Sequence, residues 1–223
     1  MERILDEELR ILKDKILYMG NLAEMMIDLS IKILLERNRG LIEQIYQHEG
    51  EINKLNIEID NQCLKILALW QPEASDLRFI LAIIKINSEL ERLGDQAINI
   101  AQNSLELLKH NMTELIEKFQ FREVTELARK MVKDSIDSFI NRDIKLAREV
   151  LIKDSELDNF KRQIFQRVIS ITTETPSSIN QGLDLILIAR NLEKIGDHAT
   201  NICEDIIFMV EGKDVRHHAD EKK

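Results

Sequence analysis

Two copies of one segment constrain the fold of this chain more than any other feature of its sequence. Residues 91–100 read ERLGDQAINI, and residues 193–202 read EKIGDHATNI, which is 102 residues further along the chain. Upstream, the correspondence holds at a spacing of 105 residues, where Glu49 matches Asp154. The difference of three residues falls in the proline-containing connection before each segment, as expected because loops tolerate changes of length better than helices. The sequence therefore predicts an internal duplication of a unit of about 100 residues.

Turn-forming residues are scarce, and this excludes most β architectures. The chain has only seven glycines and two prolines among 223 residues. A sandwich or barrel of short strands needs turn residues about every 8–12 positions. Because 44% of the residues are hydrophobic, the chain can still bury a substantial core. We therefore predict an all-α protein with few, short connections.

Helix-boundary signals divide each unit into three long helices. Thr175 followed by Pro176 is typical of an N-cap and a first helical position, and Gly212 is typical of a helix end. Asn111 and Glu114 have the spacing of a capping box. The predicted helices cover residues 4–37, 39–70, 74–109, 112–140, 143–172 and 177–211.

The predicted fold is a pair of tandem antiparallel three-helix bundles related by the duplication. The first unit is expected to cover residues 1–110 and the second residues 111–212, with a charged tail at 213–223. A helix of about 30 residues is about 45 Å long, so each bundle should be elongated.

Charge and composition narrow the classes of function. Forty acidic residues against 31 basic residues give a net charge of −9, which argues against a nucleic-acid-binding protein. Apolar runs are far shorter than the ~18 residues that a membrane span requires, although peripheral association remains open. The first residues are charged, which is unlike a signal peptide, and Cys63 and Cys203 form no C-x-x-C pair. We therefore expect a cytoplasmic protein without a membrane span.

The repeated segments carry a stripe of oxygen-bearing side chains on one flank of the third helix in each unit. Residues spaced four apart share a helix face, so the members of each stripe should lie one above another. In the first unit these residues are Glu91, Asp95 and Asn99, and in the second unit they are Glu193, Asp197 and Asn201.

The second helix of each unit carries matching residues, Glu49 and Asn53 in the first unit and Asp154 and Asp158 in the second. Facing pairs on two antiparallel helices would offer several oxygens to a shared cation, a ligand set that suits Mg²⁺, Mn²⁺ or Fe ions. Like charges four residues apart are mildly destabilising, and a bound cation would reverse that effect. Asn53 stands where the second unit has an acid, which weakens the predicted site of the first unit.

Other interpretations of these stripes stay open. A single E-x-x-x-D on a long helix is usually part of a solvated face, and the case for a metal site depends on the duplication. His198 lies off the stripe and is expected at the surface or at an interface. The Glu-x-x-His pattern of di-iron bundles is absent, and no nucleophile or phosphate-binding loop is indicated. The rivals are a metal-dependent phosphohydrolase that uses the same stripes and a metal-free helical scaffold.

At the duplicated segments the sequence resembles the PhoU family of regulators that accompany bacterial phosphate-specific transport systems. The resemblance lies in four segments and extends through nearly the whole chain. The segments are QPEASDLR at 71–78, LERLGD at 90–95, ARNLEKIGDHATNI at 189–202 and VEGKDVRH at 210–217.

This resemblance implies two three-helix bundles whose E/D-x-x-x-D motifs hold metal ions, such as Fe, Zn, Mn or Mg, in multinuclear clusters. It also implies a non-enzymatic, homodimeric regulator of phosphate homeostasis. Such a regulator couples the ATPase subunit of the phosphate ABC transporter to a sensor histidine kinase, and it restrains uptake and phosphate-starvation signalling when phosphate is plentiful. Whether this chain serves that transporter or another phosphate carrier is left open.

Overall fold

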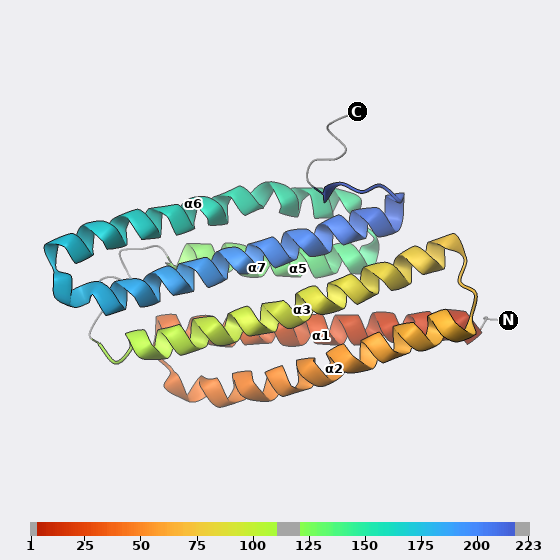
Figure 1. The fold of residues 1–223 in the computed structure, drawn as a ribbon, viewed down its shortest axis with the longest axis horizontal. Helices are drawn as coiled ribbons and strands as arrows, with labels where there is room; N and C mark the ends of the chain where they lie inside the picture. Colours follow the sequence, from red (N-terminus) through yellow and green to blue (C-terminus); the bar gives the residue numbers. More distant parts are fainter. Residues whose placement is uncertain (1–3, 111–120, 217–223) are drawn as a thin grey trace.

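The computed structural model of the chain describes residues 4–110 and 121–216, and within these ranges it is helical without strands (Figure 1). Two single 3₁₀ turns, Arg39–Leu41 and Pro176–Ser178, precede α2 and α7. The long helices are α1 (Ile4–Glu36), α2 (Ile42–Leu69), α3 (Ala74–Leu107), α5 (Phe121–Asn141), α6 (Ile144–Glu174) and α7 (Ile179–Glu211).

The structure confirms the all-α fold and the division of each unit into three long helices. Helix ends lie within a few residues of those predicted wherever the chain is described. The capping box at Asn111 and Glu114 and the start of the fourth predicted helix lie outside the described residues. Thr175 and Pro176 take the predicted N-cap and first positions, although of a 3₁₀ turn that precedes α7. The Thr175 side chain makes no capping hydrogen bond, and its carbonyl accepts one from the Ser178 hydroxyl.

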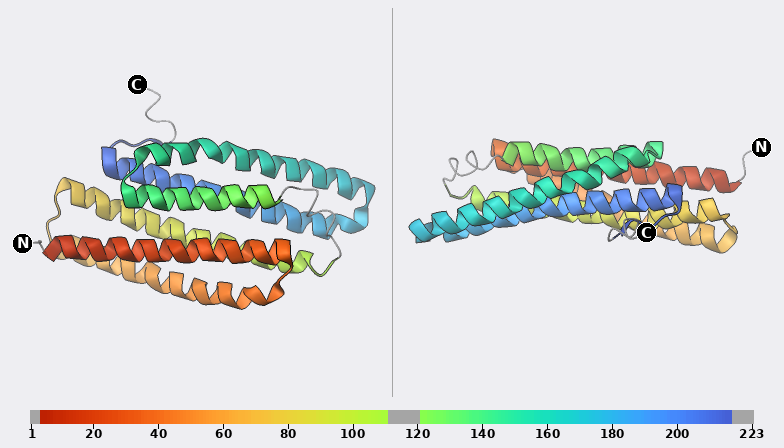
Figure 2. Two further views of the ribbon diagram at one scale, coloured as in Figure 1. Left: turned by 180° about the vertical axis from the view of Figure 1, so that it is seen from behind. Right: turned by 90° about the horizontal axis from the view of Figure 1, so that it is seen from above.

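One three-helix unit comprises α1, α2 and α3, and the other comprises α5, α6 and α7 (Figure 2). Helices α3 and α7, which carry the repeated segments, lie side by side along the junction of the units and make the most extensive helix–helix contact. They run antiparallel, since Lys85 near the start of α3 meets Asp205 near the end of α7. Antiparallel pairing of equivalent helices is the arrangement that a two-fold axis generates.

The two units are offset along the long axis of the molecule. The hairpin between α2 and α3 projects at one end and the hairpin between α6 and α7 at the other (Figures 1 and 2). The buried apolar side chains nevertheless form one continuous cluster through both units. The stacked rings of Phe79 and Phe139, with centroids 6.1 Å apart, belong to this core and join α3 to α5.

The duplication extends to unusual backbone conformations. Arg37 (φ 59°) and Arg142 (φ 51°) are the two non-glycine residues with positive φ in the described ranges, and they lie 105 residues apart. Each follows the first helix of its unit and turns the chain into the second helix. The left-handed region is costly for residues with a Cβ, so both units retain the same strained turn.

Glycines in the repeated segments bring the second and third helices of each unit close together. A Cβ on Gly196 would lie 2.5 Å from Leu157 Cδ1, and a Cβ on Gly94 would lie 3.4 Å from Ile52 Cδ1. Leu157 and Ile52 are equivalent positions in the duplication. The close approach places α6 beside α7, and α2 beside α3, at the level of the acidic stripes.

None of the described helices combines the length and the apolar character that a membrane span requires.

Two glycine substitutions should change stability in opposite directions. Gly212 ends α7 with φ 69°, where alanine is strained, so Gly212→Ala should lower the free energy of unfolding by about 1 kcal/mol. Gly50 lies inside α2, and no neighbouring atom lies within 4 Å of the place that a Cβ would take. Gly50→Ala should therefore raise the free energy of unfolding by about 0.5–1 kcal/mol. Urea denaturation followed by circular dichroism measures both changes, and the same sign for both variants would contradict this account.

Candidate metal centre

Four carboxylates of the second unit gather where α6 passes over α7. Asp154 and Asp158 lie on α6, and Glu193 and Asp197 lie on α7, each pair four residues apart. A Cβ on Gly196 would be 2.9 Å from Asp154 Oδ1, so the Asp154 carboxylate lies directly against the backbone of α7. The structure thus brings together the acidic residues that the sequence predicted to face each other.

Asp154 is the most perturbed member of this acidic cluster. Its Oδ1 atom is buried and has no hydrogen-bond partner. Burial, together with the negative charges of Asp197, Asp158 and Glu193, raises the pKa of Asp154 to about 6. A buried carboxylate oxygen without a donor is unfavourable in the absence of a proton or a cation. Asp154 is therefore the part of the cluster that most needs a positive partner.

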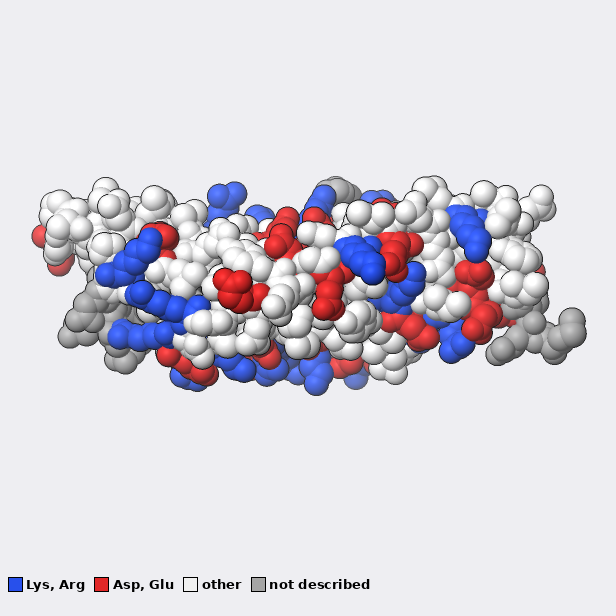
Figure 3. Space-filling view, turned by 90° about the horizontal axis from the view of Figure 1, so that it is seen from below, with Lys and Arg blue, Asp and Glu red and all other residues white. Residues whose placement is uncertain are grey.

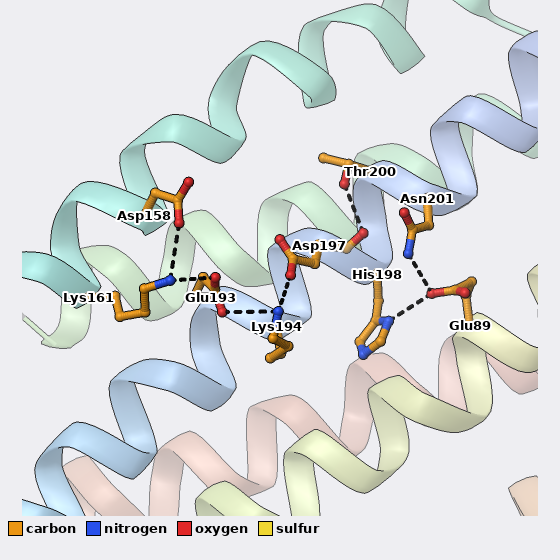
Figure 4. A network of polar contacts seen from close by, with 9 residues as sticks. All are labelled: Glu89, Asp158, Lys161, Glu193, Lys194, Asp197, His198, Thr200 and Asn201. Atoms are coloured by element: carbon orange, nitrogen blue, oxygen red, sulfur yellow. Dashed lines mark hydrogen bonds and ion pairs between the residues drawn. The ribbon is translucent and has the colours of Figure 1, made fainter. Parts of the chain in front are cut away.

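Two lysines supply positive charge to the rest of the cluster (Figure 4). Lys161 Nζ lies 2.6 Å from Glu193 Oε1 and 3.3 Å from Asp158 Oδ1. Lys194 pairs with Asp197 and lies 3.5 Å from Glu193 Oε2. Glu193, only 9% exposed, consequently touches both ammonium groups. The lysines occupy carboxylate oxygens that a metal ion would otherwise use.

The first unit has the equivalent stripe without the lysines. Burial first, and then the negative charges of Asp95 and Glu49, raise the pKa of Glu91. The three carboxylates are therefore close enough to repel one another. Asn53, Asp95 and Asn99 are exposed.

The residues equivalent to the two lysines differ in the first unit. Asn56 stands where the second unit has Lys161, and Arg92 stands where it has Lys194. Arg92 forms an ion pair with Glu89 at 3.1 Å instead of entering the stripe. The first unit thus has fewer acids and also fewer competing cations than the second.

Asn201 does not join the acidic cluster. Its amide nitrogen donates to Glu89 Oε2 at 3.1 Å, across the junction between α7 and α3 (Figure 4). The His198 ring nitrogen Nδ1 lies 2.7 Å from the same oxygen, which confirms His198 as an interface residue. Burial tends to raise the pKa of Glu89, but the contacts with His198 and Asn201 outweigh it and leave that pKa lowered. Asn201 therefore helps to join the two units.

Glu89 is the main residue that sequence reasoning missed. It is buried, it lies outside the E-x-x-x-D pattern, and no residue in the second unit repeats it, since the equivalent position is Asn191. Lys161 and Lys194 could have been found, because each lies three residues from an aspartate of the cluster on its own helix.

The residue types of the acidic cluster in the second unit fit a hard cation. Its carboxylates, however, are arranged around Lys161 and Lys194. Asp154, Asp158, Glu193 and Asp197 supply only oxygen ligands, and Asp154 Oδ1 is buried without a donor. In the conformations shown, no three His, Cys, Asp or Glu side chains of the described ranges converge as a metal site requires. Cation binding here would therefore require Lys161 and Lys194 to give up their carboxylate contacts.

A family model described as the PhoU domain matches the chain twice, at residues 16–104 and 121–206. The phosphate-specific transport system accessory protein PhoU homologue of Pseudomonas putida is 36% identical over 94% of this chain and 82% of its own length. The homologue of Aquifex aeolicus is also 36% identical, over 97% of both chains.

Solved structures with the same fold include PhoU from Pseudomonas aeruginosa, with a TM-score of 0.87 and 32% identity over 93% of this chain and 99% of the other. The phosphate transport system regulatory protein PhoU from Streptococcus pneumoniae has a TM-score of 0.85 at 27% identity, over 95% of this chain and 99% of the other.

The raised pKa of Asp154 should make stability depend on pH in metal-free protein. The unfolded carboxyl loses its proton near pH 3.8 and the folded one near pH 6, so between these values the folded state holds the extra proton and stability falls as pH rises. Asp154→Asn removes this loss of stability, because asparagine does not ionise. The variant should therefore gain about 1 kcal/mol over the natural chain at pH 7.5 and little at pH 4.5.

Urea denaturation in the presence of a chelator at the two pH values measures this gain. Glu156→Gln, which changes an exposed acid on the same helix, serves as the control and should show no such pH dependence. An equal gain for Asp154→Asn at both pH values would contradict the assignment of the raised pKa to Asp154.

Proposed function

Because this chain belongs to the PhoU family, we propose that it is an accessory regulator of a phosphate transport system. The observation that carries this proposal is the family match in both units, together with relatives that align over nearly their whole length. Those relatives are named as accessory proteins of phosphate-specific transport. The proposed role is binding rather than catalysis.

The finer part of the proposal concerns how such a regulator acts. We propose that it contacts the ATPase subunit of the phosphate transporter and a sensor histidine kinase in the cytoplasm, as a homodimer, and that it restrains uptake and starvation signalling. Acidic and basic side chains are interspersed on the face shown in Figure 3. This pattern favours recognition of a partner through local groups over attraction to one uniformly acidic surface.

We also propose that the acidic stripes bind divalent or trivalent metal ions. In the second unit the ligands would be Asp154, Asp158, Glu193 and Asp197, and in the first unit Glu49, Glu91 and Asp95, with Asn53 and Asn99 nearby. A bound ion would supply positive charge to the buried oxygen of Asp154 and would hold α6 to α7. The support for this role is the repetition of the stripes and the unpartnered oxygen of Asp154.

Metal ions should stabilise the protein through the second unit. At 100 times the dissociation constant an added ion should raise the free energy of unfolding by about 2.7 kcal/mol, or the melting temperature by about 5–10 °C. Asp197→Asn should abolish most of this shift. Thermal melts with Mn²⁺, Fe²⁺, Zn²⁺ or Mg²⁺, together with elemental analysis of the purified protein, provide the measurement and identify the metal.

Lys161→Met provides a sharper test, because it frees oxygens of Glu193 and Asp158 and removes a positive charge. This variant should bind the metal more tightly than the natural chain. Asp184→Asn changes an acid on α7 outside the cluster and is the matched control for Asp197→Asn. Its metal-induced stabilisation should equal that of the natural chain. Metal-induced shifts unaffected by both Asp197→Asn and Lys161→Met would place the ions elsewhere.

The proposed partners can be tested by affinity capture of the tagged full chain from its native cells, grown with and without phosphate. We expect the phosphate transporter ATPase and a sensor histidine kinase among the captured proteins, in amounts that depend on the phosphate supply. Recovery of neither in both conditions would contradict the proposed role. A turnover assay with phosphoesters on the same preparation separates this role from a phosphohydrolase, which would show sustained hydrolysis.

A further inference from the structure

A pocket of about 370 Å³ opens at the junction of the two units, at the end of the molecule where α3 begins and α7 ends. Its wall includes the start of α1, the first turn of α3, the end of α5 and the last turn of α7. The stacked rings of Phe79 and Phe139 form an apolar side of it. The pocket therefore touches both units and lies apart from the acidic stripes.

Basic side chains outnumber acidic ones in this pocket, although the chain as a whole carries a net charge of −9. The acids that line it are Asp6 and Asp76. The bases are Arg10, Lys13, Arg78 and Arg142. Arg10 is already paired with Glu7, at 2.6 Å and outside the lining. The remaining lining residues have a formal charge of +1, which in an acidic protein still favours an anion.

Two of the bases are held in place by backbone carbonyls. Lys13 Nζ donates to the Ile140 carbonyl at 3.1 Å, and Arg78 Nε donates to the Met209 carbonyl at 3.4 Å. A carbonyl positions the cation without cancelling its charge, whereas a carboxylate would do both. Lys13 and Arg78 therefore keep donors and a full positive charge for a ligand.

Arg142 adds a third cation from the turn between α5 and α6. Its backbone has φ 51°, and no hydrogen bond or ion pair joins its guanidinium to the described residues. A guanidinium presents two parallel donors that suit the oxygens of a phosphate. The first turn of α3 also lines the pocket at Ser75, and Glu73 provides no side-chain cap for that helix end. Uncapped amide groups at a helix start favour an anion as well.

We propose that this pocket binds one small phosphate-type anion, either inorganic phosphate or a small phosphoester. Three cations from three helices or turns, beside an uncapped helix start, match the charge and the several acceptor oxygens of such a ligand. The choice of phosphate over other oxyanions rests on the proposed function. Bound there, the anion would contact both units at once.

The complete site should occur once per chain, because the duplication repeats it only in part. At the spacing of 102 residues, Arg78 corresponds to Asn180, Phe79 to Gln181 and Asp76 to Ser178. At the spacing of 105 residues, however, Lys13 and Arg142 correspond to Lys118 and Arg37, so the duplication repeats two of the three cations and lacks the third together with its neighbouring phenylalanine. One anion per chain is the stoichiometry that follows.

Calorimetric titration of the full chain with inorganic phosphate, at constant ionic strength and with a chelator present, tests the proposal. We expect one site per chain, and about tenfold weaker binding in Arg142→Gln and in Lys13→Gln. Arg122→Gln, which removes an exposed arginine elsewhere on α5, is the matched control and should bind like the natural chain. Urea denaturation of each variant verifies that it is folded.

Parallel titrations separate the possible ligands. Glycerol 3-phosphate binding more tightly than inorganic phosphate would identify a phosphoester site, and the reverse order a site for free phosphate. Sulfate binding as tightly as both would overturn the choice of phosphate. Three results would overturn the assignment of the anion to this pocket. These are no binding at all, equal binding in Arg142→Gln and the natural chain, and binding that requires added metal and is lost in Asp197→Asn. Phosphate binding without capture of any transporter component would contradict the proposed function and leave the pocket intact.

Discussion

The packing of α3 against α7 is the contact on which the rest of this structure depends. These helices carry the repeated segments, bury the junction between the two units and extend one apolar core through the whole molecule. Polar contacts occur within the same junction. Glu89 meets His198 and Asn201, and Lys85 lies 2.7 Å from Asp205. Each third helix thus uses one flank for the neighbouring unit and another for the acidic stripe, so changes on one flank affect the position of the other.

The fold could be predicted from the sequence almost completely, because long helices leave strong periodic signals. The repeated segments established the two units, and the scarcity of glycine and proline excluded strands. Details at helix ends were harder to foresee. Thr175 and Pro176 have the expected residue types, but the chain there forms a 3₁₀ turn in which Ser178 donates to the Thr175 carbonyl. Several alternatives of similar energy exist at such an end, and a local pattern does not choose among them.

The candidate site could be predicted only in part. Spacing along one helix placed Glu193 with Asp197 and Asp154 with Asp158, and equivalence between the units placed the two pairs face to face. Spacing could not tell that Asn201 would turn towards Glu89, since that contact joins residues 112 positions apart in different units. Spacing along the sequence also could not show which of the acids would be most buried. Asp154 became the most perturbed acid because Gly196 lets α6 approach α7, which is a property of the packed pair of helices.

The antiparallel pairing of α3 with α7 has the geometry of a dimer made from two identical subunits, yet here both halves belong to one polypeptide. Separate subunits would come apart on dilution, because their association depends on concentration. A covalent tether holds the second half at an effective concentration in about the millimolar range, so the junction persists however scarce the protein becomes. Because both halves are encoded in one chain, their sequences can also differ from each other. One half could acquire Lys161 and Lys194 and the other Arg78, a division of labour that a symmetric assembly of identical chains cannot achieve.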